Sequence, residues 1–416
     1  MAPGREDTLL ATIDAEAERL RPLDLALAVL TYNNADTVGE VVAAAARGCA
    51  EAFPGARVAL VNADAGSADA TRDVVAAAGL PLVALEHESP AGERRAVPFH
   101  GVPGRGAALR AVFTAAHRLA ARGLVVLEAD AASPAPVWVE RLAGPVLGEK
   151  ADFVVPAYTR HLYDGTITRL ALSPLLRALY GRRLHQPFGG QQALSARLVE
   201  HLLLHPKWDW RGRDVADLWV TGTAIADGFS VWEAWLGPHA VRSRTRTTDL
   251  PTMLAQTLGA AFTTMDRHED LWLHVRGSEP LPAVGTPAPP SVEPTAVDVD
   301  RMLDAFRLGV RDLASIWELV LAADTLGELL GLADAPRFVF PDELWAHVVY
   351  DFALGHHYGV VHRDHLLRSL VPLYLGRTAA FVLATRGLTA AAAEAVLEAQ
   401  GQVFERQKPY LVEHWR

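Results

Sequence analysis

Two acidic residues that directly follow an apolar run are the residues of this chain best suited to chemistry. The run Leu124–Leu127 ends at Glu128, and Asp130 follows two residues later. Buried strands of parallel sheets read as short apolar runs, and ligands bind beyond the carboxyl ends of such strands. Mg²⁺ and Mn²⁺ take carboxylate ligands and are commonly completed by substrate phosphates. The pair therefore indicates a metal–diphosphate site, or else two solvated acids at a strand end.

Polar residues also follow two earlier apolar runs. The run 25–31 leads into the polar residues 32–34, and the run 58–62 leads into the polar segment 63–69. In a parallel sheet the carboxyl ends of neighbouring strands meet at one edge. Three such loops suit a nucleotide, because one can contact the base, another the ribose, and the acidic pair the metal-bound diphosphate.

Apolar runs alternate with helical patterns through the first 275 residues, which predicts a mostly parallel, doubly wound α/β sheet. The expected strands are 25–31, 58–62, 81–85, 124–127, 153–157 and 230–236. The expected helices are 7–21, 37–46, 71–78, 107–121, 138–147, 166–180 with an irregularity at Pro174, 195–204, 214–226 and 249–275. The segment 86–103 is long, polar and interrupted by Gly and Pro, so we expect a functional or mobile loop there rather than a simple connector.

Composition shifts divide the chain into three parts. Residues 22–276 form the predicted α/β domain, and residues 277–297 form a Pro-rich segment that reads as a surface linker. Residues 298–416 have a helical pattern with short breaks, which predicts an all-α C-terminal region. This region is where we expect a homodimer contact, if the protein forms one.

The overall composition excludes several classes of protein. Half of the 416 residues are hydrophobic and 21% are charged, so the chain can bury a large core. The net charge of −10 argues against nucleic acid as a partner. The single cysteine, Cys49, excludes an internal disulfide. We find no apolar run of 18 residues, no signal-peptide pattern and no nucleophile elbow, so we expect a cytoplasmic protein that neither spans a membrane nor is a hydrolase.

Three motifs around the acidic pair resemble the GT-A fold of nucleotide-sugar glycosyltransferases. VNADAGSADATRDVV is similar to that family's strand and turn, EAD to its acidic metal motif, and PGRGAALR to its turn beside the donor phosphates. Glu128 stands where the family usually has Asp, and Arg105 where it has Lys. The resemblance implies a nucleotide-sugar site, with UDP-glucose or GDP-mannose as donor and Mg²⁺ or Mn²⁺ as metal. Its expected contacts are Thr31, Tyr32, Asn33, Asp64, Arg105, Glu128, Ala129 and Asp130.

Two later segments narrow the resemblance to the retaining GT-A group that contains the mannosylglycerate and glucosyl-3-phosphoglycerate synthases. The segments YDGTITRLALSPLL and HQPFGGQQALS are similar to the acceptor region of that group. The resemblance places Asp217 where the group has its catalytic-centre aspartate. It implies that the acceptor and sugar are contacted by Arg160, Asp164, Thr166, Thr168, Gln186, Gly189 and Gly190.

One departure from the group concerns the metal. The group has a histidine after its last strand that completes the metal site, and Val241 falls at that place in this chain. His239 lies two residues earlier and can share its face if the segment is extended. We therefore expect the metal ligands to be Asp130, Glu128 and His239. The alternative is a loop histidine at 239, with a metal site completed by water or a weaker metal requirement.

A second departure concerns the acceptor. Thr166 stands where the phosphoglycerate enzyme has an arginine that grips the acceptor phosphate. A hydroxyl attracts phosphate far less than a guanidinium does. This favours an unphosphorylated acceptor such as glycerate over 3-phosphoglycerate, unless Arg160, Arg169 or Arg182 takes the missing role.

The combined expectation is a retaining transferase that moves glucose or mannose from a nucleotide diphosphate to glycerate, 3-phosphoglycerate or a related small hydroxy-acid. A sugar-phosphate nucleotidyltransferase is one alternative, although the segment LTYNNADTV lacks the Gly-rich basic loop that such enzymes carry after their first strand. A non-catalytic nucleotide-sugar-binding relative is the other, because the residues at 105, 128 and 241 depart from the pattern.

Overall fold

The computed structural model describes residues 5–95, 100–131, 133–208, 216–238, 249–287 and 297–415. The chain divides into two compact units. The first, called the sheet unit below, consists of Met1–Thr159, Phe188–Thr248 and Leu281–Pro289. The second, called the helical unit, consists of Arg160–Pro187, Asp249–Pro280 and Pro290–Arg416.

The sheet unit is built on an eight-stranded sheet in the order β10-β8-β5-β7-β4-β1-β2-β3. Neighbouring strands are parallel except β7, which runs antiparallel to both β4 and β5. The strands are β1 (Leu25–Thr31), β2 (Val58–Asp64), β3 (Leu82–Glu86), β4 (Gly123–Glu128), β5 (Phe153–Thr159), β7 (Gln192–Ser195), β8 (Val231–Pro238) and β10 (Ala283–Val284). The predicted mostly parallel α/β sheet is therefore confirmed, with one antiparallel strand inside it.

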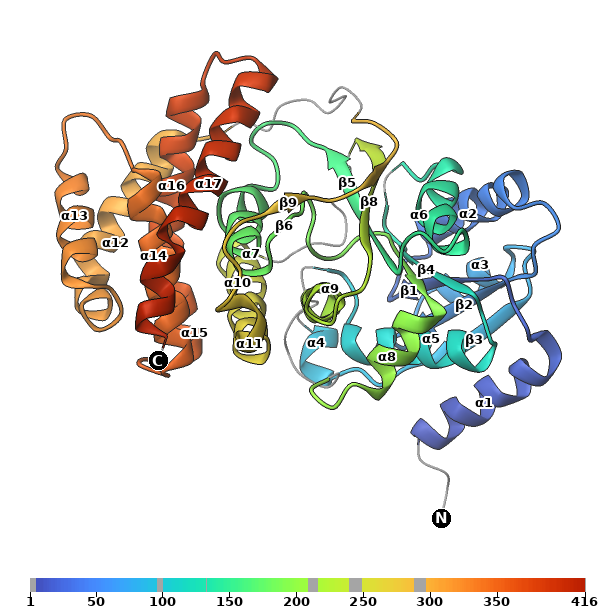
Figure 1. The fold of residues 1–416 in the computed structure, drawn as a ribbon. Helices are drawn as coiled ribbons and strands as arrows, with labels where there is room; N and C mark the ends of the chain where they lie inside the picture. Colours follow the sequence, from blue (N-terminus) through green and yellow to red (C-terminus); the bar gives the residue numbers. More distant parts are fainter. Residues whose placement is uncertain are drawn as a thin grey trace. The chain divides into compact units, whose positions relative to one another are not determined.

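Helices cover both faces of this sheet (Figure 1). One face carries α2 (Val38–Ala52), α3 (Thr71–Ala76) and α6 (Val137–Leu147). The other carries α1 (Arg5–Leu20), α5 (Arg105–Arg118), α8 (Ala196–Leu204) and α9 (Ala216–Ala226). The helices attach by apolar stripes: α2 buries Val38, Val41, Val42 and Ala45, which repeat at helical spacing.

The register of the central strands brings the polar strand ends together. Thr31 at the end of β1 pairs with Asp64 at the end of β2, and Leu30 pairs with Glu128 at the end of β4. The bodies of these strands are buried and almost wholly apolar, as expected when helices cover both faces. The fold thus places three of the predicted polar loops at one edge of the sheet.

The helical unit contains the C-terminal helices together with two earlier segments of the chain. Its elements are a π-helical turn (Thr168–Leu172), α7 (Ser173–Tyr180), α10 (Leu250–Arg267), α11 (Glu269–Trp272), α12 (Val299–Val320), α13 (Ala323–Ala333), α14 (Asp342–His357), α15 (Arg363–Ser369), α16 (Val371–Thr385), α17 (Ala390–His414) and the short strand pair β6 (Arg182–Arg183) and β9 (Glu279–Pro280). The predicted all-α C-terminal region is confirmed.

Side chains of the C-terminal helices explain why residues 160–187 fold with them. The carbonyl of Leu170, in the π-helical turn, accepts hydrogen bonds from Trp345 Nε1 at 2.6 Å and Gln400 Nε2 at 3.1 Å. Arg177 of α7 donates to the carboxylates of Glu398 and Glu405 on α17. The compact units therefore differ from the predicted domains, in which residues 22–276 stood together.

Several local predictions differ from the structure. The segment 86–103, expected to be a loop, contains the short helix α4 (Ala91–Arg95). The Pro-rich segment 277–297, expected to be a linker, contains β9 and β10, which pair with β6 and β8. The helix expected over 166–180, with an irregularity at Pro174, is divided into a π-helical turn and α7. The helix expected over 249–275 is divided into α10 and α11. The strand β7 was missed because it has only four residues.

One helical stretch, Arg363–Thr385, is long and apolar enough to cross a membrane by length and composition alone. However, 72% of its most apolar window is buried in the structure, and it consists of the separate helices α15 and α16. Such burial is typical of a core helix.

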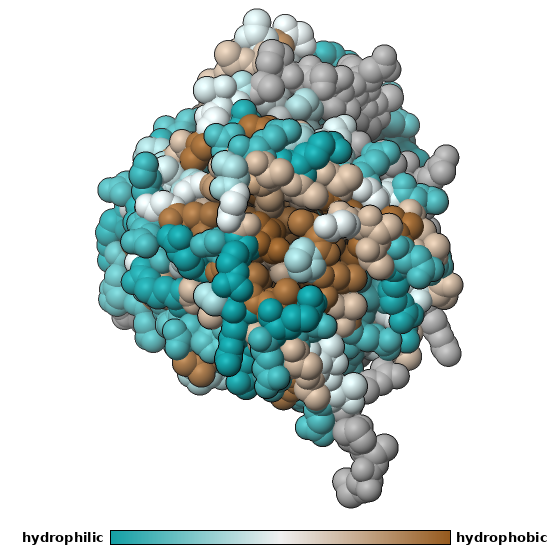
Figure 2. Space-filling view, turned by 90° about the vertical axis from the view of Figure 1, so that its right-hand side faces the viewer, coloured by the Kyte–Doolittle hydropathy of each residue, from teal (hydrophilic) through white to brown (hydrophobic). Residues whose placement is uncertain are grey.

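Apolar residues also reach the surface at the β3 edge of the sheet unit. Figure 2 shows them gathered in the middle of the face that includes α1, α2, α3 and β3, with hydrophilic residues around them. These elements carry partly buried apolar side chains that pack against the core, among them Val74, Leu80 and Leu82. The core is thus only partly covered at its edge strand, β3.

Candidate functional site

Asp64, at the end of β2, organises the loops that follow the first two strands. Its carboxylate accepts hydrogen bonds from Thr31 Oγ1 at 2.8 Å, Ser67 Oγ at 2.6 Å, Ser67 N at 2.7 Å and Gly66 N at 2.9 Å. A carboxylate has about four acceptor positions, and these four donors occupy them. Asp64 is 1% exposed, so it acts here as the internal anchor of the turn. Its predicted contact with the base remains a prediction.

The loop after β1 is fastened to the loop after β2. Asn33 has a left-handed backbone, with φ of 54°, its N–H donates to Ser67 Oγ at 2.8 Å, and its Oδ1 accepts from Ala68 N at 2.8 Å. Tyr32 is half-buried, and its hydroxyl donates to the Arg94 carbonyl at 3.3 Å. Thr31, Tyr32, Asn33 and Asp64 are thus brought together in one rigid corner of the sheet unit.

Arg105 begins α5 at the edge where the strand ends lie. The turn before it requires glycine, because Gly104 has a φ of +67° and a Cβ there would lie 2.5 Å from the Glu88 carbonyl oxygen. Arg105 is 3% exposed and forms a bidentate ion pair with Asp217 of α9, at 2.5 Å from Nε and 2.9 Å from Nη2. The structure therefore joins two predicted site residues that are 112 positions apart in sequence.

Both partners of this pair are held in their charged forms. Burial by itself would lower the pKa of Arg105, but Asp217, Glu128 and Asp130 together raise it above its usual range. Burial by itself would raise the pKa of Asp217, but Arg105 holds it below its usual value. Arg105 Nη1 is buried and has no hydrogen-bond partner among the described residues. Within the described part of the chain, one N–H-bearing edge of this buried guanidinium therefore has no protein acceptor.

Glu128 connects this cation to the loop at residues 189–190. Its Oε1 accepts a hydrogen bond from Gly190 N at 2.8 Å and lies 3.9 Å from Arg105 Nη2. Gly190 has a φ of +75°, and a Cβ there would lie 2.7 Å from the Tyr158 hydroxyl, so only glycine fits. Gly189 lies beside the same carboxylate, with its Cβ position 3.7 Å from Glu128 Oε1.

Asp130 lies after β4, two residues beyond Glu128, and is 6% exposed. Ala129 between the two acids is also buried. Oxygen donors from Glu128 and Asp130 beside a strand end are the ligand type that Mg²⁺ and Mn²⁺ select, so these residues fit the predicted metal. His239, the third predicted metal ligand, lies outside the described residues.

The loop before α5 adds residues that sequence reasoning did not assign. A Cβ at Gly101 would lie 4.0 Å from Asp130 Oδ2, and the charge of His100 contributes to the lowered pKa of Asp217. Glu93 Oε2 accepts the Gly104 N–H at 2.7 Å and so supports the turn before Arg105. The length and polarity of segment 86–103 marked it as functional, but neither feature singled out His100.

The residues predicted to contact the acceptor lie in the helical unit, apart from Gly189 and Gly190. Arg160 Nη1 lies 3.2 Å from Asp164 Oδ2, and its Nη2 donates to Gln186 Oε1 at 3.0 Å. Gly165 has a φ of +63°, and a Cβ there would lie 3.3 Å from Arg160 Cδ. The structure thus brings Arg160, Asp164 and Gln186 together.

Two threonines of this region are held differently. Thr166 Oγ1 lies 2.5 Å from the Tyr374 hydroxyl of α16, so this hydroxyl already has a protein partner. Thr168 is buried at the start of the π-helical turn. π-Helical turns are rare and occur often at functional sites. The contact of Thr168 with the acceptor or sugar stays a prediction.

Among known proteins, the chain is similar to solved structures but to no family model or curated sequence. A crystal structure of glucosyl-3-phosphoglycerate synthase from Mycobacterium tuberculosis with Mn²⁺, UDP and glucosyl-3-phosphoglycerate is similar at 23% identity and a TM-score of 0.45, covering 65% of this chain and 85% of that one. A structure of that enzyme with Mn²⁺, UDP-glucose and phosphoglyceric acid is similar at 24% identity and a TM-score of 0.45, covering 62% and 84%. A third, with Mg²⁺ and UDP, has 24% identity and a TM-score of 0.45, covering 62% and 83%.

Proposed function

We propose that the chain is a nucleotide-sugar glycosyltransferase whose sheet unit binds the donor diphosphate together with Mg²⁺ or Mn²⁺. The observation that supports this most directly is the buried guanidinium of Arg105. The Nε and Nη2 atoms of Arg105 donate to Asp217, while its Nη1 has no hydrogen-bond partner among the described residues. Guanidinium groups bind phosphate oxygens by directed N–H donors, and Glu128 and Asp130 supply metal ligands in the same place.

Each residue has a distinct part in this proposal. Asp130 and Glu128 would hold the metal, which would supply positive charge that stabilises the leaving diphosphate. Arg105 donates to the diphosphate through Nη1 and adds a second positive charge that is fixed before the reaction begins. Both carboxylate oxygens of Asp217 accept hydrogen bonds from Arg105, so we assign Asp217 as a positioning residue for that guanidinium.

The transferred sugar and its acceptor are the finer part of the proposal. We propose transfer of glucose or mannose, with retention, to glycerate or a related small hydroxy-acid. Arg160, held by Asp164 and Gln186, would bind the acceptor carboxylate. The Thr166 hydroxyl is already hydrogen-bonded to the Tyr374 hydroxyl, so it would bind an acceptor phosphate only weakly. This supports glycerate over 3-phosphoglycerate as the acceptor.

A donor-by-acceptor screen with mass detection tests the proposal. UDP-glucose and GDP-mannose are each incubated with Mn²⁺ or Mg²⁺ and with D-glycerate or 3-phosphoglycerate. We expect a glycoside that requires the metal, and we expect Asp130→Ala to reduce its formation at least about 100-fold, since metal stabilisation of the leaving group amounts to several kcal/mol.

Other results would point to the alternatives. Metal-dependent binding of UDP or GDP without product from any acceptor would indicate a non-catalytic relative. Formation of a nucleotide sugar and pyrophosphate from a nucleoside triphosphate and a sugar phosphate would indicate a nucleotidyltransferase. Unchanged nucleotide binding in Asp130→Ala, with no product from any donor, would overturn the proposal.

A further inference from the structure

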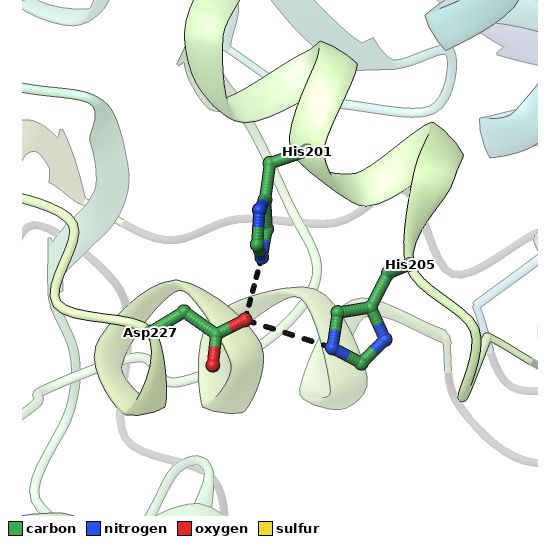
Figure 3. A group of neighbouring side chains, drawn as sticks. All are labelled: His201, His205 and Asp227. Atoms are coloured by element: carbon green, nitrogen blue, oxygen red, sulfur yellow. Dashed lines mark hydrogen bonds and ion pairs between the residues drawn. The ribbon is translucent and has the colours of Figure 1, made fainter.

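Three side chains of the sheet unit converge away from the strand ends. His201 Nε2 lies 2.6 Å from Asp227 Oδ2, and His205 Nε2 lies 3.6 Å from the same oxygen. Figure 3 shows both imidazoles turned toward the one carboxylate oxygen. Among the described residues, this is the one group of three or more His, Cys, Asp or Glu side chains whose ligand atoms all lie within 4.8 Å of one another.

The secondary structure produces this convergence. His201 lies in the last turn of α8, and His205 is the C-cap of that helix, so the two imidazoles are one helical turn apart on one face. Asp227 comes directly after the last residue of α9. The three residues therefore belong to the carbonyl ends of two helices, and such ends carry partial negative charge that favours a cation.

Neighbouring groups limit the movement of the imidazoles. The ring of His201 packs on Phe229 at 5.0 Å between centroids, and the ring of His205 packs on Trp219 at 5.4 Å. His205 Nδ1 accepts the backbone N–H of Lys207 at 3.2 Å. That local contact would be given up if His205 bound through Nε2 and carried its proton on Nδ1. Lys207 is exposed, so water can replace the lost partner.

The donor set and spacing select a particular class of ligand. Two imidazole nitrogens and one carboxylate oxygen are the ligands that Zn²⁺ takes in three-ligand sites, at about 2.0–2.2 Å each. Ligand atoms of a tetrahedral site at those bond lengths are about 3.4 Å apart. The distances from Asp227 Oδ2 to His201 Nε2, 2.6 Å, and to His205 Nε2, 3.6 Å, lie on either side of that value. The imidazole ligands also make this cluster chemically different from Glu128 and Asp130. Those two residues offer only oxygen ligands, which suit a harder cation.

We propose that His201, His205 and Asp227 bind one Zn²⁺ ion, with water as the fourth ligand, at a site separate from the donor metal. Binding displaces the hydrogen bond between His201 Nε2 and Asp227 Oδ2. A neutral His201 then carries its ring proton on Nδ1, whereas a protonated His201 releases one proton to water. The ion would fasten the end of α8 to the end of α9, the helix that carries Asp217 at its start. The proposal does not depend on the proposed transferase activity.

Zinc titration of the full-length, tag-free protein, stripped of metal and free of nucleotide, tests the site. We expect one Zn²⁺ per chain in competition with a chromophoric chelator. Replacing Zn²⁺ by Co²⁺ should produce the visible absorption of a tetrahedral ion. His201→Gln and Asp227→Asn should each weaken Zn²⁺ binding at least about tenfold, since the loss even of outer partners costs about 10- to 100-fold.

Two controls make the result specific. His362 and His365 of the helical unit have ring centroids 5.7 Å apart, close to the 5.6 Å between His201 and His205, so His362→Gln should leave the titration unchanged. Asp130→Ala should also leave it unchanged, since Asp130 belongs to the other site. Circular dichroism without metal checks that each variant is folded. Equal Zn²⁺ binding by wild type, His201→Gln and Asp227→Asn, or no tetrahedral Co²⁺ spectrum, would overturn the proposal.

Discussion

Arg105 and Asp217 form a buried, bidentate ion pair, with Nε to Oδ2 at 2.5 Å and Nη2 to Oδ1 at 2.9 Å. Arg105 is 3% exposed and Asp217 is 1% exposed. The pair joins the first turn of α5 to the first turn of α9, and it fixes the direction in which Arg105 presents Nη1. The same contact therefore bears on stability and on the proposed donor site.

The first prediction separates these two effects. Asp217→Asn removes the carboxylate that is directly hydrogen-bonded to a buried guanidinium, and we expect the free energy of unfolding to fall by about 3 kcal/mol, as for other broken buried pairs. The double variant Arg105→Met/Asp217→Leu removes both charges and should recover most of that loss. Urea unfolding measures the stabilities, and UDP binding with Mn²⁺ should be lost in the double variant although it is folded. Equal destabilisation of the single and double variants would contradict this account of the pair.

The second prediction tests the geometry of the arginine. Arg105→Lys keeps the positive charge but loses the planar set of N–H donors. The lysine therefore cannot bind Asp217 in a bidentate manner and donate to a diphosphate at the same time. We expect the Kd for UDP with Mn²⁺ to rise about 30-fold, which corresponds to about 2 kcal/mol for hydrogen bonds to a charged group. Arg110→Lys changes a more exposed arginine of the same helix and serves as control. Similar Kd values for the two variants would remove Arg105 from the donor site.

A third prediction concerns the loop that holds Glu128. Gly190→Ala places a Cβ 2.7 Å from the Tyr158 hydroxyl and should displace the Gly190 N–H from Glu128. We expect weaker Mn²⁺-dependent UDP binding, measured by calorimetry. Gly79→Ala has a matched φ of +74° with no atom within 4 Å, so it should cost only the backbone strain of about 1 kcal/mol. Tyr158→Phe in the Gly190→Ala background should restore part of the binding, whereas no restoration would contradict the proposed clash.

The positions of the strand ends could be predicted because each depends only on the residues of that strand and its immediate neighbours in sequence. The apolar runs before Thr31, Asp64 and Glu128 mark buried strands, and parallel pairing then requires their ends to meet. What the residues do at those ends was less predictable. Asp64 is occupied by donors such as Ser67 Oγ, and this depends on a turn whose geometry residue types do not determine. Likewise, Asp217 was assigned to the reaction centre, but its direct partner is Arg105.

Contacts distant in sequence and weak in pattern were missed. The strand β7 has four residues and follows a Gly-rich segment, so its place between β4 and β5 has no clear signal. His201 and His205 are a turn apart on a helix, but their partner Asp227 is more than 20 residues further along the chain. Residues 160–187 were assigned to the α/β domain because the ion pairs of Arg177 with Glu398 and Glu405 of α17 depend on tertiary packing, which the sequence pattern does not reveal.

The fourth prediction concerns stability in acid. Asp152, just before β5, accepts hydrogen bonds from Arg197 Nε at 3.1 Å, Ser195 Oγ at 3.0 Å and Ser230 N at 3.1 Å. Burial by itself would raise the pKa of Asp152, but Arg197 and the other donors hold it below its usual value. A carboxyl whose pKa is lower in the folded chain stabilises the fold above its unfolded pKa of about 3.9, and this contribution is lost as pH falls through the folded value.

Replacing Asp152 should therefore change both the level and the slope of the stability curve. Asp152→Asn should lower the free energy of unfolding at pH 7 by about 1 kcal/mol, the usual value for a lost hydrogen-bonding partner. It should also make the loss of stability below about pH 4 less steep, because one titrating group is gone. Arg197→Gln tests the cause: without the guanidinium the pKa of Asp152 should return toward its usual value, so the acid slope should again become shallower. Urea unfolding from pH 7 to pH 2.5 measures these curves, and an unchanged slope in both variants would show that Asp152 does not contribute to acid unfolding.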